Sequence, residues 1–372
     1  MPGWALNVLK DLIMEEKMKA QTLHATSQPE IRIFTLVSDR KTLDGVPITT
    51  VFPWRLNHLF TTRLDYRNLI VFAPCLMRIL SRKIKKYIER RDDLSHDVEL
   101  IQRDKPNEIY ISSFAIAKNI SLSTFDFRPS TKLYLHSPMQ YIRSHYEEYT
   151  HKLKWWKGRL FKKIVPRLRA RDTKFTKFDS VYSNSNYTAK LAKEIYGLNA
   201  TVKYPIVHCH CEWNEAICTE SLPYYIYTGR LVKFVKEVDK IIELFNHTHD
   251  PLIIIGSGPD EAYLKSIAHP NIIFVDWTDD KKEIYKILAQ SRWFINLTKE
   301  SFWISTAEAL LLGVPVFGYD EGATPELVDE DSWVLVNHKD LHALISKFDE
   351  FKSKQRDREK ISEHIKSKLG TI

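Results

Sequence analysis

The feature that most constrains the fold of this chain is a repeated alternation between short apolar segments and longer segments of helical periodicity. The short segments are rich in β-branched and aromatic residues, and several are apolar at nearly every position. Such strands are typical of parallel sheets covered by helices on both faces, and the alternation predicts βαβ units. We expect strands at 31–37, 108–112, 132–136, 180–183, 201–204, 224–228, 252–255, 272–275, 293–297, 314–318 and 332–336. The helices between them include 238–246, 260–268, 281–289 and 305–312.

The length of 372 residues suits two domains rather than one. We predict an α/β protein with a Rossmann-like N-terminal domain at 1–205, a Rossmann-like C-terminal domain at 206–355 and a terminal helix at 356–372. Near the boundary, Pro205 and a patch rich in His, Cys, Trp and Asn interrupt the periodicity. Pro2-Gly3 already resembles the loop before a helix at 4–16, so the first strand of the N-terminal domain is missing. Either the chain begins inside its first βα loop, or the sheet forms without that strand.

The amino-acid composition indicates the cellular compartment and the class of binding partner. Four cysteines give no disulfide framework, which favours a reducing cytoplasm. The start of the chain lacks the pattern of a signal peptide, and no apolar run approaches the ~18 residues of a spanning helix. We therefore expect a cytoplasmic protein, soluble or peripheral. The net charge of +8 points to anionic partners: phosphates, an acidic membrane surface or nucleic acid.

Residues 151–177 concentrate this charge. They carry eleven Lys and Arg residues against one acid, Asp172, and Trp155, Trp156 and other apolar residues are interleaved. A helix of this kind can lie on an anionic bilayer, here the inner face of the cell membrane. The alternative is a solvated or domain-packing helix. Nucleic acid is not expected as a partner, because no recognised binding motif accompanies the charge.

Three segments carry candidate chemistry. A buried strand ends in Gly256-Ser257-Gly258-Pro259, where backbone can approach a ligand, although such a turn can equally be a tight corner. Glu300 and Glu308 bracket a strand-to-helix turn whose amides suit a diphosphate, with Ser305 or Thr306 as a cap. The alternative there is an ordinary capped helix with solvated acids. Arg230 and Lys236 could neutralise a leaving diphosphate or lie in a basic surface loop.

In order and spacing these segments resemble the donor domain of the family 4 retaining glycosyltransferases. The motifs are Gly229-Arg230-Leu231 with Lys236, Gly256 to Pro259, Glu300 with Glu308, and Gly313-Val314-Pro315-Val316 followed by Gly322-Ala323-Thr324-Pro325-Glu326. The resemblance implies the GT-B fold, two Rossmann-like domains with parallel sheets facing a central cleft. It covers the first half more loosely. There, the stretch from His136 to Tyr141 is similar to a branch that includes mannosyltransferases of surface-polysaccharide assembly.

The resemblance implies a role for each site residue. Glu300 would bind hydroxyls of the transferred sugar, and Arg230 and Lys236 would hold the diphosphate. His136 would face the sugar from the N-terminal domain, with a buried core histidine as the alternative. Glu308 would bind the ribose. The remaining nucleotide contacts would be Ser257, Gly258, Trp277, Ile304, Ser305 and Thr306.

The implied reaction moves a hexose, with mannose as a candidate, from a GDP- or UDP-hexose to a glycan or lipid-linked glycan acceptor. No cofactor beyond this co-substrate and no metal are implied. His208, Cys209, His210, Cys211 and Cys218 include zinc-ligand types, but their spacing is not that of a standard finger. Two rival functions remain: a GT-B nucleotide-sugar epimerase or hydrolase, and a non-catalytic binding protein. Three departures from the family matter. Trp303 stands where glycine is usual and could crowd the sugar or reshape its pocket. The loop from Arg230 to Lys236 is one residue longer, and the missing first strand removes part of the glycine-rich loop that normally lies near donor and acceptor.

Overall fold

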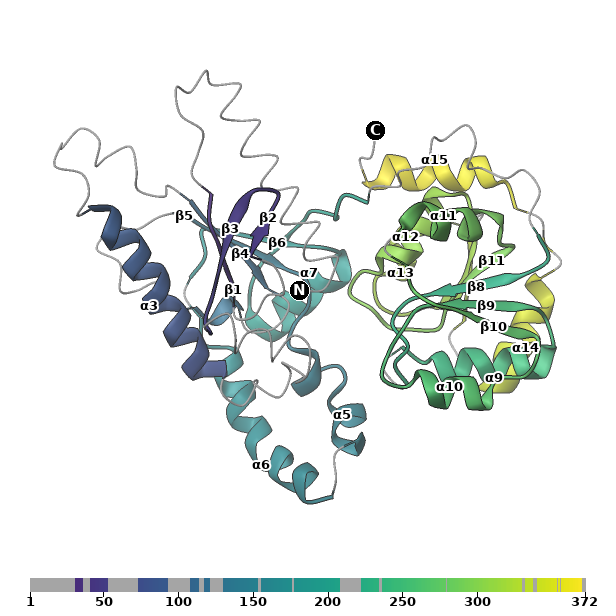
Figure 1. Ribbon diagram of the computed structural model, residues 1–372, viewed down its shortest axis with the longest axis horizontal. Coiled ribbons are helices and arrows are strands. Elements are labelled where there is room, and N and C mark those ends of the chain that lie inside the picture. The colour runs from purple at the N-terminus through teal and green to yellow at the C-terminus, as the bar shows by residue number, and fades with distance from the viewer. Residues whose placement is uncertain are drawn as a thin grey trace. The chain divides into compact units, whose positions relative to one another are not determined.

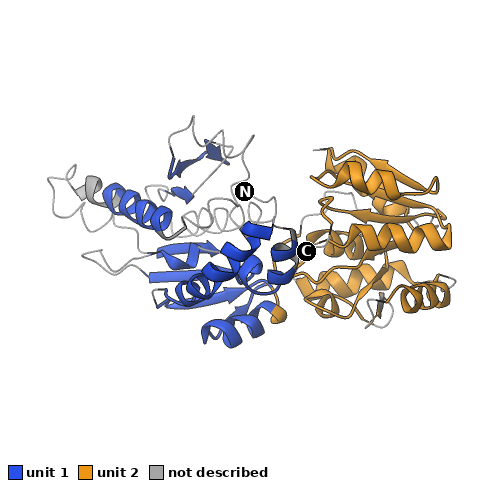
Figure 2. Ribbon diagram, turned by 90° about the horizontal axis from the view of Figure 1, so that it is seen from below, with its two compact units in different colours: residues 1–184, 188–203 blue, residues 185–187, 204–372 orange. Residues whose placement is uncertain are grey.

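A computed structural model shows two compact units, coloured separately in Figure 2. Unit 1 comprises residues 1–184 and 188–203, and unit 2 comprises residues 185–187 and 204–372. The structure describes residues 31–35, 41–52, 73–92, 108–113, 117–120, 130–152, 155–175, 177–207, 222–233, 236–278, 280–329, 332–336, 340–352, 354 and 356–369. The predicted helix at 4–16, the start of the chain where we expected no first strand, and the His/Cys patch at 208–218 lie outside these residues.

Unit 2 contains a six-stranded parallel sheet in the order β10-β9-β8-β11-β12-β13. Its strands are β8 (Tyr225–Thr228), β9 (Leu252–Ile255), β10 (Ile272–Val275), β11 (Trp293–Asn296), β12 (Val316–Tyr319) and β13 (Trp333–Val336). The three strands that come first along the chain extend outward from β8 in one direction, and the last three extend from β11 in the other. This is the doubly wound order of a Rossmann fold, as the strand and helix pattern predicts.

Helices cover both faces of this sheet (Figure 1). One layer contains α9 (Val238–Thr248), α10 (Glu261–Ile267) and α14 (Leu341–Phe351), and the other contains α11 (Lys281–Gln290), α12 (Ile304–Leu311) and α15 (Arg358–Leu369). Alternate residues of one strand enter different layers: Tyr225 and Tyr227 pack with α9 and α14, whereas Ile226 packs with α11 and α12. The near-continuous apolar character of the strands follows from this two-sided burial.

The terminal helix that we predicted at 356–372 is α15 and belongs to unit 2. Its packing on the N-terminal domain stays a prediction. Ile361, Ile365 and Leu369 recur at four-residue spacing and are buried in the core that contains α12. The Ser362 hydroxyl donates to the Leu311 carbonyl at 2.7 Å. This apolar stripe is complementary to a helix face that unit 2 itself supplies.

Unit 1 contains a four-stranded parallel sheet in the order β4-β5-β6-β7. The strands are β4 (Glu108–Ser113), β5 (Ser130–Leu135), β6 (Ser180–Ser183) and β7 (Thr201–Val202). Its helices are α3 (Ala73–Asp92), α5 (Tyr146–Lys152), α6 (Trp155–Asp172) and α7 (Asn186–Tyr196), with short 3₁₀ turns η2 (Ala117–Asn119) and η3 (Gln140–Ile142). The core between sheet and helices contains Leu76 and Leu80 of α3, Leu133 of β5 and Ala192 of α7.

The strand predicted at 31–37 does not join this sheet. Instead β1 (Ile33–Thr35) pairs in parallel with β3 (Val46–Thr50), which also pairs antiparallel with β2 (Thr42–Leu43). Asp44 and Gly45 join β2 to β3 with φ angles of 49° and 82°. Two consecutive positive φ angles are those of a type I′ hairpin turn, so a local turn pairs β2 with β3, and β1 adds to this hairpin. Among the helices in the described part of the chain, none combines the length and apolar character that crossing a bilayer requires.

Candidate functional site

The predicted site residues of unit 2 gather where the sheet reverses its strand order. β8 and β11 are neighbours at the centre of the sheet, and their next strands, β9 and β12, lie on opposite sides of them. In open parallel sheets ligands bind at this switch point, beyond the carboxyl ends of the strands. Arg230 follows β8 and Glu300 follows β11. The fold therefore brings both residues to the same edge.

The glycine turn after β9 is held against the loop after β8. A Cβ atom on Gly256 would lie 1.9 Å from the carbonyl oxygen of Gly229, and one on Gly258 would lie 2.1 Å from that of Leu231. The Leu231 amide donates to the Ser257 carbonyl at 3.0 Å. These glycines therefore let two loops meet backbone to backbone, and the Ser257 side chain is left exposed.

Arg230 and Lys236 have different surroundings. The Arg230 side chain is exposed and forms no ion pair with any residue that the structure describes. Lys236 forms an ion pair with Glu300, with Nζ 2.6 Å from Oε1 and side chains that are 21% and 16% exposed. The two residues to which the resemblance gives separate parts of a sugar donor are thus in direct contact.

Trp303 is buried beneath this ion pair. It is 7% exposed, and the Lys236 ammonium lies 4.5 Å from its ring centroid, in the range of a cation–π contact. The ring meets Tyr227 edge-on at 5.8 Å and Phe294 at 6.2 Å between centroids. Burial raises the pKa of the Tyr227 hydroxyl, and the nearby charge of Glu300 raises it further.

Helix α12 begins at the same edge with free amide groups. We expected Ser305 or Thr306 to cap it, and that prediction is wrong: Trp303 is the N-cap residue and makes no side-chain cap. The Thr306 hydroxyl instead accepts a hydrogen bond from Asn296 at 3.0 Å. The Ile304 and Ser305 amides have no carbonyl one turn back, and they donate to no backbone acceptor within the described ranges. With the helix dipole they form a site suited to an anion.

Glu308 and Trp277 occupy the part of the site predicted to bind the nucleotide. Glu308 is 8% exposed, and its Oε1 accepts hydrogen bonds from the Tyr285 hydroxyl at 2.8 Å and from Lys281 Nζ at 2.9 Å. Both contacts fall on Oε1, so Oε2 is the oxygen that these described partners leave for a ligand hydroxyl. Trp277 follows β10 and is 46% exposed, so its ring is accessible to a planar group.

His136 is described within unit 1. It follows β5, is 2% exposed, and has its Nε2 2.8 Å from the Ser112 hydroxyl oxygen. Desolvation lowers the pKa of His136 to about 3, so the imidazole is neutral near pH 7. The described contacts suit the buried core histidine that we held as the alternative, and its role toward a sugar stays a prediction.

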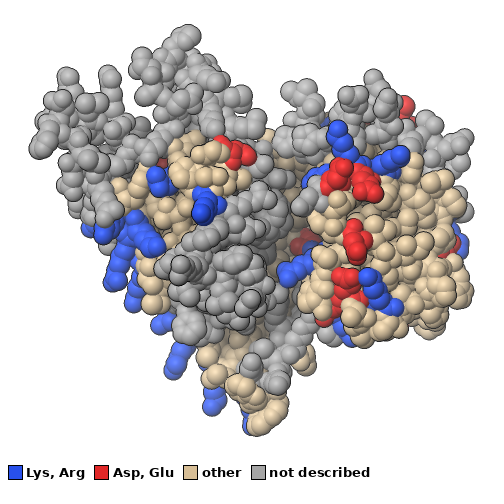
Figure 3. All heavy atoms as spheres, in the orientation of Figure 1, with Lys and Arg blue, Asp and Glu red and all other residues tan. Residues whose placement is uncertain are grey.

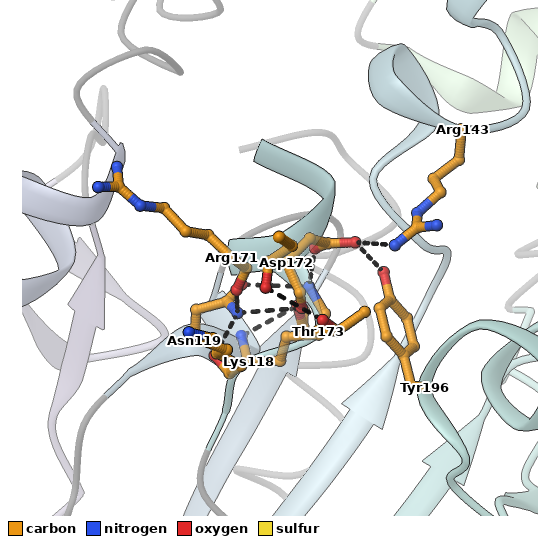
Figure 4. Close-up of polar contacts among 10 residues, drawn as sticks. Lys118, Asn119, Arg143, Arg171, Asp172, Thr173 and Tyr196 are labelled. Carbon is orange, nitrogen blue, oxygen red and sulfur yellow. Dashed lines mark hydrogen bonds and ion pairs between the residues drawn. The ribbon is translucent and has the colours of Figure 1, made fainter. Parts of the chain in front are cut away.

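The loop after His136 is supported by a buried polar network that sequence reasoning missed. Asp172, at the end of α6, accepts from Lys118 on one carboxylate oxygen and from Tyr196 at 2.8 Å and Arg143 at 3.5 Å on the other (Figure 4). The Asn119 amide donates to the Asp172 carbonyl at 3.2 Å and to two neighbouring carbonyls, so it caps the end of α6. Burial lowers the pKa of Lys118, and the charge of Asp172 opposes this. The one available signal was Asp172 as the sole acid in a basic segment.

Helix α6 also presents the basic and aromatic surface predicted from residues 151–177. Trp155, Trp156 and Leu160 are 75%, 51% and 53% exposed. In Figure 3 Lys and Arg side chains of unit 1 gather along one edge, over α3 and α6. The exposed basic residues include Arg78, Arg82 and Lys86 of α3 and Arg159, Lys162, Lys163 and Arg167 of α6. Within the described residues, no three His, Cys, Asp or Glu side chains are grouped as a metal site requires.

Comparison with known proteins defines the family of the central part of unit 2. Residues 223–352, about a third of the chain, match the family model described as glycosyl transferases group 1. These residues form a glycosyltransferase group 1 domain. Every predicted site residue of unit 2, from Arg230 to Glu308, lies inside this match.

Relatives of known sequence or structure extend the comparison. An uncharacterized 41.2 kDa protein in the cps region of Klebsiella pneumoniae is 24% identical over an alignment of 218 residues that covers 53% of this chain and 56% of that protein. The match thus spans little more than half of that relative. Sucrose-phosphate synthase from Thermosynechococcus elongatus superposes with a TM-score of 0.62 at 12% identity, covering 96% of this chain and 88% of the other. A glycosyltransferase from Rickettsia africae ESF-5 superposes with a TM-score of 0.56 at 11% identity, covering 96% of this chain and 89% of the other. Both superpositions support the GT-B fold, with two Rossmann-like units.

Proposed function

We propose that this protein is a retaining glycosyltransferase that moves a hexose from a nucleotide diphosphate sugar to a glycan or lipid-linked glycan acceptor. The observation that carries the proposal is the switch point of unit 2, inside the glycosyltransferase group 1 domain. There Arg230, Lys236 and the free amides of α12 offer positive charge, and Glu300 offers a hydroxyl acceptor beside them. A sugar diphosphate needs both kinds of group next to each other.

The chemistry of transfer follows from these groups. As the bond between C1 of the sugar and the diphosphate oxygen breaks, its electron pair stays on the diphosphate and C1 becomes oxocarbenium-like. Arg230, Lys236 and the Ile304 and Ser305 amides stabilise the growing negative charge by position and electrostatics. The acceptor hydroxyl oxygen then bonds to C1 on the face that the diphosphate leaves, which retains the configuration, and its proton passes to the departing diphosphate oxygen.

The remaining site residues bind the ribose and the base of the nucleotide. Glu308 accepts hydrogen bonds from the ribose hydroxyls through Oε2, because Tyr285 and Lys281 hold Oε1. Trp277, Ser257 and Gly258 border the base. Our candidate for the transferred sugar is mannose, because the His136–Tyr141 stretch is similar to a branch that includes mannosyltransferases. The candidate nucleotide of the donor is GDP, with UDP as the alternative. The relative in a cps region supports a role in polysaccharide synthesis.

We also propose that the enzyme works in the cytoplasm, at the inner face of the cell membrane. Exposed tryptophans and basic residues on α6 support this, since such a helix places its aromatic side chains in the lipid headgroup region and its charges against anionic lipids.

A donor survey tests the proposed function. The full chain is incubated with GDP- and UDP-hexoses, each with and without a lipid-linked acceptor, and products are separated by chromatography. A glycosylated acceptor with one equivalent of nucleoside diphosphate supports transfer. Free sugar or an epimerised donor without acceptor would indicate a hydrolase or epimerase, and binding without turnover would indicate a binding protein.

A further inference from the structure

The Lys236–Glu300 ion pair joins two groups that the proposed function gives to different parts of the donor. Lys236 serves the diphosphate, and Glu300 serves the hydroxyls of the sugar. In the structure each satisfies the other, at 2.6 Å between Nζ and Oε1. The charge that a diphosphate would use is therefore paired with the Glu300 carboxylate.

Contacts around the pair hold both partners in place. The Lys236 carbonyl accepts from the Thr298 hydroxyl at 3.0 Å. The Glu300 carbonyl accepts from the Ala323 amide at 2.9 Å, and a Cβ on Gly322 would lie 2.5 Å from that same oxygen. Trp303, fixed by Tyr227 and Phe294, lies under the ammonium. The backbones of both partners are thus held in place, and the Trp303 ring contacts the Lys236 side chain.

We propose that the Lys236–Glu300 pair makes the site select complete sugar nucleotides over nucleoside diphosphates. This inference rests on the proposed function. A nucleoside diphosphate that takes Lys236 leaves the Glu300 carboxylate largely buried, without its counter-ion, and close to an added negative charge. A complete donor supplies sugar hydroxyls, which donate to Glu300 and replace the contact that Lys236 gives up.

The same difference acts after transfer. Once the sugar has moved to the acceptor, Glu300 loses its hydroxyl donors and competes again for Lys236. The product diphosphate is then held less tightly than the donor was, so the pair favours release of product and entry of new donor.

Removing the charge of Glu300 tests the inference, because the loss of a site residue's charge should then increase the affinity for nucleoside diphosphates. In Glu300→Gln, GDP and UDP should bind about 3- to 10-fold more tightly than to the wild type, since Lys236 loses a partly exposed competitor whose pairing contributes about 1 kcal/mol. The affinity of the matching sugar nucleotides, titrated without acceptor, should be unchanged or lower than in the wild type. Isothermal titration calorimetry measures both.

Matched variants separate this effect from general electrostatics and from misfolding. Glu321→Gln removes a carboxylate whose ion pair, with Lys299 at 3.3 Å, is separate from Lys236, and it should leave diphosphate binding unchanged. In a Lys236→Ala background, Glu300→Gln should no longer tighten binding. Glu300→Asp, which shortens the reach to Lys236, should give a smaller tightening and serves if Glu300→Gln does not fold.

The outcomes are distinguishable from failure of the proposed function. Equal or weaker binding of diphosphate to Glu300→Gln, with donor binding intact in the wild type, would overturn the inference and leave the function standing. Absence of binding of every nucleoside diphosphate and sugar nucleotide to the wild type and to Glu300→Gln would overturn both.

Discussion

Two lysine–carboxylate pairs, Lys118–Asp172 in unit 1 and Lys236–Glu300 in unit 2, show how the same chemistry can serve different ends. Both side chains of the first pair are fully buried, whereas those of the second are partly exposed. Asp172 also accepts from Arg143 and Tyr196, so both of its oxygens are occupied. Glu300 has only the Lys236 ammonium as its ion-pair partner among the described residues.

This difference in surroundings separates a structural pair from one suited to a ligand. A buried charge that is satisfied on all sides ties its elements together, here η2, the loop after β5, α6 and α7. A pair with open coordination and some exposure can exchange one partner for an incoming group. Substitutions at the first pair should therefore lower the free energy of unfolding, whereas substitutions at the second should change ligand binding or turnover.

The largest effect is expected from Asp172→Ala. It leaves the Lys118 ammonium buried without its partner, which should lower the free energy of unfolding by about 3–5 kcal/mol. Urea titration measures it. Asp349→Ala breaks an exposed pair with Lys352 and should cost at most about 1 kcal/mol. Adding Lys118→Met to Asp172→Ala should restore part of the loss by removing the unpaired charge. A loss no larger than that of Asp349→Ala would mean that the buried pair does not stabilise unit 1.

Charge reversal on α6 should come next. Replacing four exposed basic residues with glutamate should abolish binding to anionic vesicles, because each contributes about 1 kcal/mol near such a surface. The residues are Arg159, Lys162, Lys163 and Arg167. Cosedimentation with phosphatidylserine-containing vesicles measures binding. The matched control reverses four exposed lysines of unit 2, namely Lys282, Lys286, Lys347 and Lys360. Binding that survives reversal on α6 and ignores salt would contradict membrane attachment.

Glu300→Ala tests whether the carboxylate of the unit 2 pair acts in turnover and not in stability. If Glu300 binds sugar hydroxyls, turnover should fall by about 10²–10³-fold, or roughly 3–4 kcal/mol of transition-state stabilisation. Nucleoside diphosphate should still bind, and stability should change far less than in Asp172→Ala. Steady-state kinetics with the donor identified by the survey measures the first effect. Wild-type turnover in the folded variant would remove Glu300 from the site.

The architecture of unit 2 could be predicted because local signals and the fold agree. Its strands are apolar on both faces and end at turns or helix starts, so their positions follow from periodicity. Their order places Arg230 and Glu300 at one edge once the sheet is assumed to be doubly wound. What could not be predicted are contacts between side chains distant in sequence. The pairing of Lys236 with Glu300 across 64 residues is one such contact.

In unit 1 the predictions that were wrong or incomplete have similar causes. The strand β3, with which β1 pairs, belongs to a hairpin whose turn is Asp44-Gly45, and a helix-and-strand pattern does not weigh that turn signal. Lys118 is a lone lysine in a short 3₁₀ turn, and nothing in its local sequence indicates burial. Its partner Asp172 lies 54 residues away. Such pairs depend on tertiary packing, which periodicity alone does not specify.

The central claim is that the switch point of unit 2 holds the diphosphate of a sugar donor, and Arg230 tests it most directly. Its guanidinium is exposed at the end of β8 and can grip two phosphate oxygens. Calorimetric titration should compare nucleoside diphosphate and monophosphate binding to the wild type and to Arg230→Ala. The account predicts that diphosphate binding weakens by about 10- to 150-fold, the loss of one charge-assisted contact of roughly 1.5–3 kcal/mol, and that monophosphate binding changes much less. Equal losses for both nucleotides, or no loss for either, would show that Arg230 is a surface arginine and that the diphosphate site lies elsewhere.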